Sequence, residues 1–92
     1  MEDLERQRKK LMFQCHYRGT KELDLVLGSF ADAHLADMTA DELRILSAFL
    51  NEIDPDIYDW LSGRAPLPLR LQNQMTQRLV AFGRRLLLGE SV

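Results

Sequence analysis

The stretch that decides the fold is residues 39–61, TADELRILSAFLNEIDPDIYDWL, which holds two helix-start signals and no strand-like alternation of apolar and polar residues. Thr39 followed three residues later by Glu42 is the pattern of a capping box, in which the two side chains satisfy free backbone N–H groups of the first turn. Asp54 followed by Pro55 is a second signal, with Asp54 expected as the N-cap and Pro55 at the first helical position. The stretch therefore predicts two consecutive helices.

Helical periodicity continues on both sides of this stretch. We expect one helix from Glu2 to about Tyr17, interrupted by Gly19, and a second that ends near Ala36. After the helix that carries Trp60, which Gly63 should stop, a proline-rich connector over residues 64–68 leads to a last helix ended by Gly89. The apolar residues expected on the inner faces are Leu4, Leu11, Met12, Cys15, Leu23, Val26, Leu27, Phe30, Leu43, Leu46, Phe49, Leu50, Ile57, Leu61, Leu71, Met75, Leu79, Phe82 and Leu86.

These elements predict an all-α fold, a small five-helix bundle. A chain of 92 residues forms one domain, and it has no room for a cofactor-binding domain beside a substrate domain. We therefore assign residues 1–92 to a single helical domain, with frayed ends near residues 1–4 and 89–92. No apolar run approaches the ~20 residues that cross a bilayer, so no membrane span is expected.

Charge divides the chain into three parts. Residues 1–21 carry a net +3, residues 22–59 a net −9 and residues 60–92 a net +4. Either the basic ends pair with the acidic middle inside the molecule, or the acidic part docks on a partner of complementary charge. A nucleic-acid binder needs a basic face. A small helical antitoxin-type or nucleic-acid-binding module, built on the arginines of the last third, is therefore the alternative function, and we expect no nucleic-acid partner.

The chain lacks the residue patterns of an active site or a metal centre. Cys15 and His34 have no ligand-type spacing, and they are expected as a small buried hydrophobe and a helix-end residue. The acids Asp54, Asp56 and Asp59 lack the glycine and terminal glutamate of a calcium loop. We therefore expect a protein that is not an enzyme, without catalytic or metal-binding residues and without a stably bound cofactor.

Two local clusters stand out. The first is Tyr17-Arg18-Gly19-Thr20-Lys21-Glu22-Leu23-Asp24. It lies between two helices, where Gly19 allows a tight corner through a positive φ or a close backbone approach. Its structural interpretation makes Gly19 the N-cap, with Glu22 reaching back to the Gly19 N–H. Its functional interpretation is an exposed Arg18 and Glu22 pair presented to a partner, since arginine makes forked hydrogen bonds to carboxylates and phosphates.

The second cluster, Asp54-Pro55-Asp56-Ile57-Tyr58-Asp59-Trp60, gathers two aromatic residues and three acids on a short helix. We expect Trp60 to fill the core. For Tyr58, core packing and a role as interface anchor are equally favoured, because tyrosine is enriched at binding hot spots.

Three elements together resemble the succinate dehydrogenase assembly factor 2 family, whose bacterial members are called SdhE. They are Arg18-Gly19-x-x-Glu22 continued by Leu23-Asp24, then Thr39-x-x-Glu42 in an acidic stretch, and then Asp54-Pro55-Asp56-Ile57-Tyr58-Asp59-Trp60. The resemblance runs from about Arg8 to Phe82, and it implies a five-helix bundle. It also implies a non-catalytic assembly chaperone that binds the flavoprotein subunit of succinate dehydrogenase, and in bacteria of fumarate reductase, and promotes covalent attachment of FAD to it. FAD is then the client's cofactor.

The resemblance also implies which residues contact the flavoprotein. Carried over by position, the partner-binding residues are Arg18, Gly19, Glu22, Asp54, Tyr58 and Trp60. Many bacterial relatives have methionine where this chain has Thr20, so that contact differs here. The start MEDLERQRKK lacks the features of a secretory signal or a transit peptide, which favours a bacterial cytoplasmic location over the mitochondrial matrix.

Overall fold

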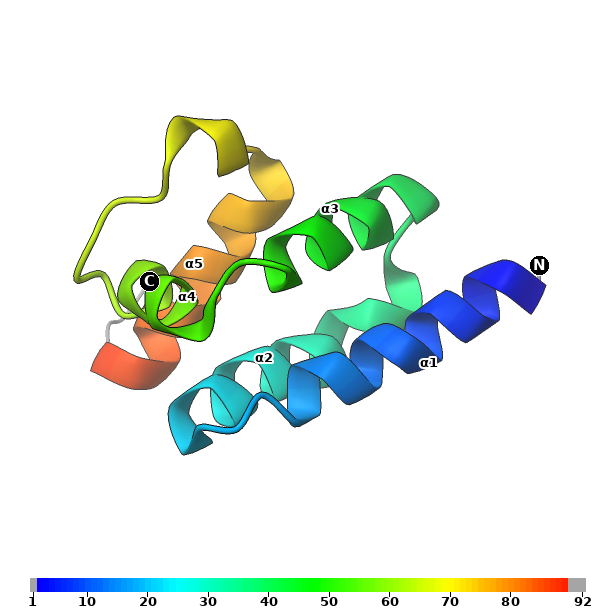
Figure 1. Ribbon diagram of the computed structural model, residues 1–92, viewed down its shortest axis with the longest axis horizontal. Helices are drawn as coiled ribbons and strands as arrows, with labels where there is room; N and C mark the ends of the chain where they lie inside the picture. Colours follow the sequence, from blue (N-terminus) through cyan, green and yellow to red (C-terminus); the bar gives the residue numbers. More distant parts are fainter. Residues whose placement is uncertain (1, 90–92) are drawn as a thin grey trace.

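Five α-helices make up most of the protein, as the sequence predicts (Figure 1). The computed structural model describes residues 2–89, and no strand occurs among them. The helices are α1 (Glu2–His16), α2 (Lys21–His34), α3 (Ala40–Leu50), α4 (Asp54–Leu61) and α5 (Gln74–Leu88), with the 3-10 turns η1 (Leu35–Asp37) and η2 (Leu69–Leu71). The expected fraying falls partly on Met1 and residues 90–92, outside the described residues, and stays a prediction.

Several helix ends follow from local sequence. The capping box of α3 is confirmed, since the Glu42 N–H donates to Thr39 Oγ1 at 3.2 Å and the Thr39 N–H donates to Glu42 Oε1 at 2.9 Å. A second box, which the sequence reading missed, joins Asn73 and Thr76 at the start of α5. Gly89 ends α5 in the left-handed region, with φ of 68°, as expected.

The start of α4 differs from the prediction. Ile53, not Asp54, is the N-cap, and no side chain caps this helix. Asp54 is the first helical residue and Pro55 the second, so the proline still lies where its missing N–H costs no hydrogen bond. The predicted cap fails because the Asp54 carboxylate is bound to a side chain from another part of the chain, described below.

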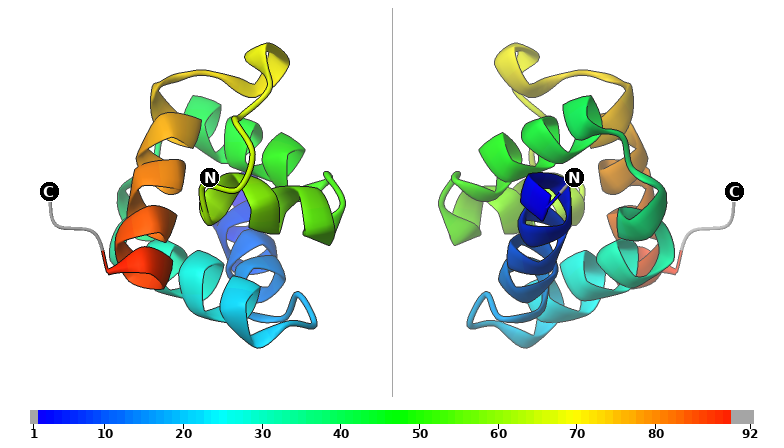
Figure 2. Two further views of the ribbon diagram at one scale, coloured as in Figure 1. Left: turned by 90° about the vertical axis from the view of Figure 1, so that its left-hand side faces the viewer. Right: turned by 90° about the vertical axis from the view of Figure 1, so that its right-hand side faces the viewer.

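The five helices pack around one shared core. α1 and α2 form an antiparallel pair, α3 lies across α1, and α5 packs against α2, α3 and α4 (Figures 1 and 2). The buried hydrophobic side chains come from all five helices and from η1 and its end, and they include most of those expected: Leu11, Cys15, Leu23, Val26, Leu27, Phe30, Ala31, Leu35, Met38, Leu43, Leu46, Phe49, Leu50, Ile57, Trp60, Leu61, Met75 and Leu79.

Leu86 was expected on the inner face of α5, but it is 42% exposed. The inner face continues from Leu79 through Gly83 to Leu87, which packs against the core. The pattern misled because Gly83 has no apolar side chain to mark the face. Here α5 comes close to α4 and α2: a Cβ on Gly83 would lie 2.9 Å from the Leu61 carbonyl oxygen and 3.3 Å from Val26 Cγ1.

The approach at Gly83 gives a stability prediction. Alanine is a better helix former than glycine, yet Gly83→Ala should lower the free energy of unfolding by about 1–3 kcal/mol, because backbone must move to make room. Gly28→Ala is the matched control, since its Cβ would meet the His16 ring, a side chain that can turn away. Urea denaturation should show the larger loss for Gly83→Ala. Equal losses would contradict the packing argument.

Cys15 is fully buried, as expected of a small hydrophobe. Burial raises the pKa of its thiol from 9.0 to about 12. We predict that iodoacetamide labels Cys15 in urea but not in the native protein at pH 8, as mass spectrometry would record. Rapid native labelling would show that the site opens.

The buried thiol also makes stability depend on pH. The pKa of Cys15 is higher in the folded protein than in the unfolded chain, so the stability gained by burying the neutral thiol is present below pH 9 and is lost as the pH rises toward 12.

Candidate functional site

Arg18 joins the two clusters that the sequence singled out. Its Nε and Nη2 donate to Asp54 Oδ1 at 3.1 and 2.7 Å, and Nη2 also donates to the Leu50 carbonyl at 3.0 Å. The Arg18 side chain is only 14% exposed and that of Asp54 30%. Charge-assisted bonds shielded from water in this way are stronger than surface ion pairs. Arg18 therefore ties the α1–α2 corner to the end of α3 and the start of α4.

The corner itself is fixed by its backbone. The Arg18 N–H donates to Asp24 Oδ1 at 2.6 Å. Gly19 has φ of 104°, and no atom lies within 4 Å of the place where its Cβ would be. Within the protein its role is therefore the positive φ and not close packing against another segment. Gly19 is also not the N-cap, because Thr20 fills that place and its Oγ1 accepts from the Leu23 N–H at 3.3 Å.

The prediction that Arg18 and Glu22 are both exposed is wrong for Arg18. Arg18 points inward because Asp54 supplies a carboxylate 36 residues away in sequence. Glu22 is exposed, and within residues 2–89 its carboxylate has no hydrogen bond or ion pair. The Glu22 charge faces solvent, while the Arg18 charge is compensated by Asp54 inside the protein.

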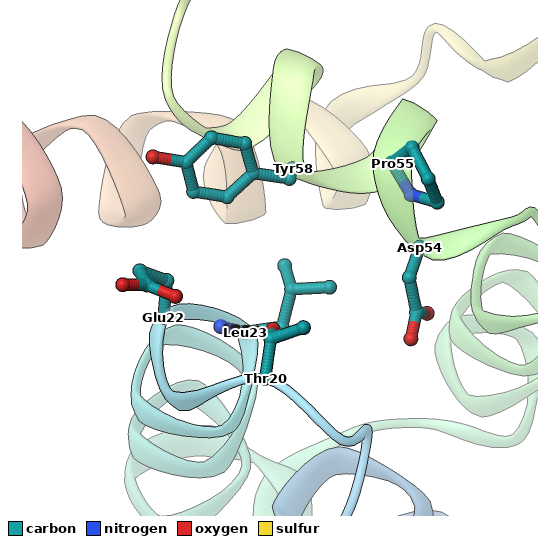
Figure 3. Close-up of a pocket in the computed structure, with 6 residues that line it drawn as sticks. All are labelled: Thr20, Glu22, Leu23, Asp54, Pro55 and Tyr58. Atoms are coloured by element: carbon teal, nitrogen blue, oxygen red, sulfur yellow. Dashed lines mark hydrogen bonds between the residues drawn. The ribbon is translucent and has the colours of Figure 1, made fainter.

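An open groove of about 480 Å³ lies where the two clusters meet. Its walls come from the start of α2 and the start of α4, and its lining consists of Thr20, Glu22, Leu23, Asp54, Pro55 and Tyr58. Figure 3 shows the Tyr58 hydroxyl end and the Glu22 carboxylate facing each other across the groove from opposite walls. Three of the six residues assigned to partner binding therefore line one surface.

The two aromatic residues of the second cluster have different places. Trp60 is 6% exposed and packs against Phe49, with ring centroids 5.9 Å apart, which confirms its expected place in the core. Tyr58 is partly buried against the core and also lines the groove, so both alternatives for it hold in part. Trp60 anchors the helix that carries Tyr58 to the core.

Basic side chains of the last third pair with the acidic middle. Arg70 donates to both oxygens of Glu52 at 2.8 and 2.9 Å, and this forked contact lowers the pKa of the Glu52 carboxyl. Arg78 lies 3.3 Å from Glu42. The intramolecular interpretation of the charge pattern is thus confirmed for these two arginines. Because both are paired with acids, neither adds to a continuous basic face for nucleic acid.

Fold and groove define a class: a small all-α protein in which two separate sequence motifs line one open groove. Among residues 2–89, no helix has the length and apolar character needed to span a membrane.

Comparison with known proteins gives the family. A family profile described as "Flavinator of succinate dehydrogenase" matches residues 9–83, which include both motifs, and the chain belongs to this family. It is 39% identical over 83 residues to the FAD assembly factor SdhE of Acetobacter pasteurianus, covering 90% of this chain and 76% of that protein.

Mitochondrial relatives are similar over a shorter share of their length. The chain is 37% identical over 73 residues to succinate dehydrogenase assembly factor 2 of Dictyostelium discoideum, which covers 79% of this chain and 52% of the relative. It is 41% identical over 75 residues to the protein of that name from Candida glabrata, covering 78% and 49%. The chain thus spans about half the length of these mitochondrial relatives.

The bridge between the motifs gives a testable energy. Arg18→Met or Asp54→Ala alone should lower the free energy of unfolding by about 2 kcal/mol, because each leaves a shielded polar partner unsatisfied. A double-mutant cycle should give a coupling of about 1–2 kcal/mol. The control cycle on Arg44 and Asp41, whose side chains are 72% and 79% exposed, should give at most about 0.5 kcal/mol. Similar couplings in the two cycles would refute the bridge as the link between the motifs.

Proposed function

We propose that this protein is an assembly factor that binds the flavoprotein subunit of succinate dehydrogenase and promotes covalent attachment of FAD to that subunit. One observation carries the proposal. The family match spans residues 9–83, and within that range Arg18 and Asp54 bring the two motifs together on one groove. The name of the Acetobacter pasteurianus relative, FAD assembly factor, points to the same activity.

The partner-binding residues divide into two groups in this proposal. Glu22 and Tyr58 contact the flavoprotein directly, because both line the groove. Gly19 lets the client approach the corner, since the space where a side chain would stand is open. Arg18, Asp54 and Trp60 act as positioning residues: the first two form the bridge, and the third holds α4 from the core.

The mechanism is a shift of populations. Covalent flavin attachment requires the flavin and the accepting side chain of the client to be held in a reactive geometry. A rigid bundle that binds one arrangement of the client more tightly than the others raises the population of that arrangement. The factor then needs no catalytic residue and no bound FAD of its own. We therefore propose a role that is not enzymatic, with FAD as the cofactor of the client.

Two finer assignments belong to the same proposal. The flavoprotein subunit of fumarate reductase is a second client, on the ground of the resemblance between this chain and bacterial SdhE proteins. A bacterial cytoplasmic location is supported by the similarity to the Acetobacter pasteurianus factor.

Flavinylation of a purified subunit tests the function. Apo-flavoprotein subunit and FAD are mixed with the factor, and covalent flavin is read by in-gel fluorescence after denaturation. Wild type should speed the reaction. Glu22→Ala should reduce the effect at least tenfold, because it removes a charge from the contact surface while circular dichroism stays unchanged. Asp37→Ala is the matched control, an exposed acid in η1 at the other end of α2. No effect of wild type on either subunit would refute the function.

A further inference from the structure

The polar groups at the groove are compensated inside the protein, with one exception. Asp54 Oδ1 accepts two bonds from Arg18, and Asp24 Oδ1 accepts from the Arg18 backbone. The Thr20 hydroxyl accepts from the Leu23 N–H. Of the two carboxylates that line the groove, Asp54 is paired with Arg18, and Glu22 has no hydrogen bond or ion pair within residues 2–89. Glu22 is therefore the uncompensated charge of the groove.

The facing wall is aromatic and apolar. Tyr58 and Pro55 come from α4, with Leu23 below them from α2. Within residues 2–89 the Tyr58 ring has no aromatic or cation neighbour, although Phe30, Phe49 and Trp60 all have ring partners. The Tyr58 ring and the Glu22 carboxylate thus stand on opposite walls of the same opening (Figure 3).

Such a pair of walls selects a cation over an anion or a neutral group. The ring attracts a cation by its quadrupole, and the carboxylate adds a charge-assisted hydrogen bond. The positive ends of α2 and α4 also face the groove, but acids in their first turns, Glu22, Asp24, Asp54 and Asp56, offset them. Residues 22–59 carry a net −9, and three of these acids pair with arginines from outside the range. The remaining net −6 favours approach of a basic partner.

We propose that the groove binds the guanidinium group of an arginine side chain on the flavoprotein subunit, stacked on Tyr58 and hydrogen-bonded to Glu22. Arginine fits better than lysine because its planar group stacks on a ring while its edge donates in a fork to a carboxylate. This assignment rests on the proposed function, since it names the group that the client inserts. It explains why Arg18 is held inside: an arginine left in the groove would occupy the place of the incoming one.

The first test uses the free protein and needs no client. Amide resonances are followed by NMR while methylguanidinium chloride is added, with methylammonium chloride at equal concentration as the matched probe. We expect methylguanidinium to shift the resonances of Glu22, Tyr58 and their neighbours more than methylammonium does. Glu22→Gln should abolish the difference. Equal shifts from both cations, or shifts spread evenly over the acidic surface, would overturn the guanidinium assignment.

The second test measures the complex with the apo-flavoprotein subunit by calorimetry. Glu22→Gln should weaken binding about tenfold or more and flatten its salt dependence. Tyr58→Leu should weaken binding, and Tyr58→Phe should lose less because the ring remains. Asp37→Asn is the control at the far end of α2. The double variant Glu22→Gln with Tyr58→Leu should lose less than the product of the two single losses, since both side chains hold one cation.

The two proposals fail in different ways. Flavinylation by wild type, together with unchanged binding in Glu22→Gln, overturns the arginine assignment and leaves the assembly function standing. Groove-confined shifts with methylguanidinium, together with no flavinylation of either subunit, overturn the function and support the cation site.

Discussion

The contact between Arg18 and Asp54 is the one on which the rest of the site depends. α2 and α4 meet through few contacts of their own, and their starting turns are brought together by this single guanidinium. Arg18 also donates a hydrogen bond to the Leu50 carbonyl at the end of α3. One side chain thus fixes the α1–α2 corner, the end of α3 and the start of α4. The groove is the space that remains between elements held in this way.

The same contact shows what could be predicted from sequence and what could not. The capping box of Thr39 and Glu42 depends on two residues in one turn, and the prediction was correct. The prediction that Asp54 caps α4 used the same local logic and failed, because the Asp54 carboxylate bonds Arg18 36 residues away. A short-range rule has no information on a competing partner that only the tertiary fold supplies.

The candidate site was predictable in its parts and not in its geometry. The motifs gave Glu22 and Tyr58, and the resemblance assigned both to partner binding. From sequence alone, Arg18 was expected on the surface beside Glu22, because two opposite charges close together in one motif suggest a pair that faces a partner. Leu23, Asp24 and Pro55 fall within the two clusters, but nothing in the sequence gave them their places at the site. Asp24 fixes the corner through the Arg18 N–H, and Leu23 and Pro55 line the groove. The misplaced Leu86 has a related cause, since the inner face of α5 passes through a glycine.

Gly83 has a consequence for the groove, although it lies on another side of the bundle. It lets α5 touch both the Leu61 carbonyl at the end of α4 and Val26 in the middle of α2. α4 and α2 are also the helices whose first turns form the two walls of the groove. A side chain at position 83 would push α5 away from α4 and α2. We therefore expect the spacing between the two groove walls to depend on the absence of a side chain at this interior position.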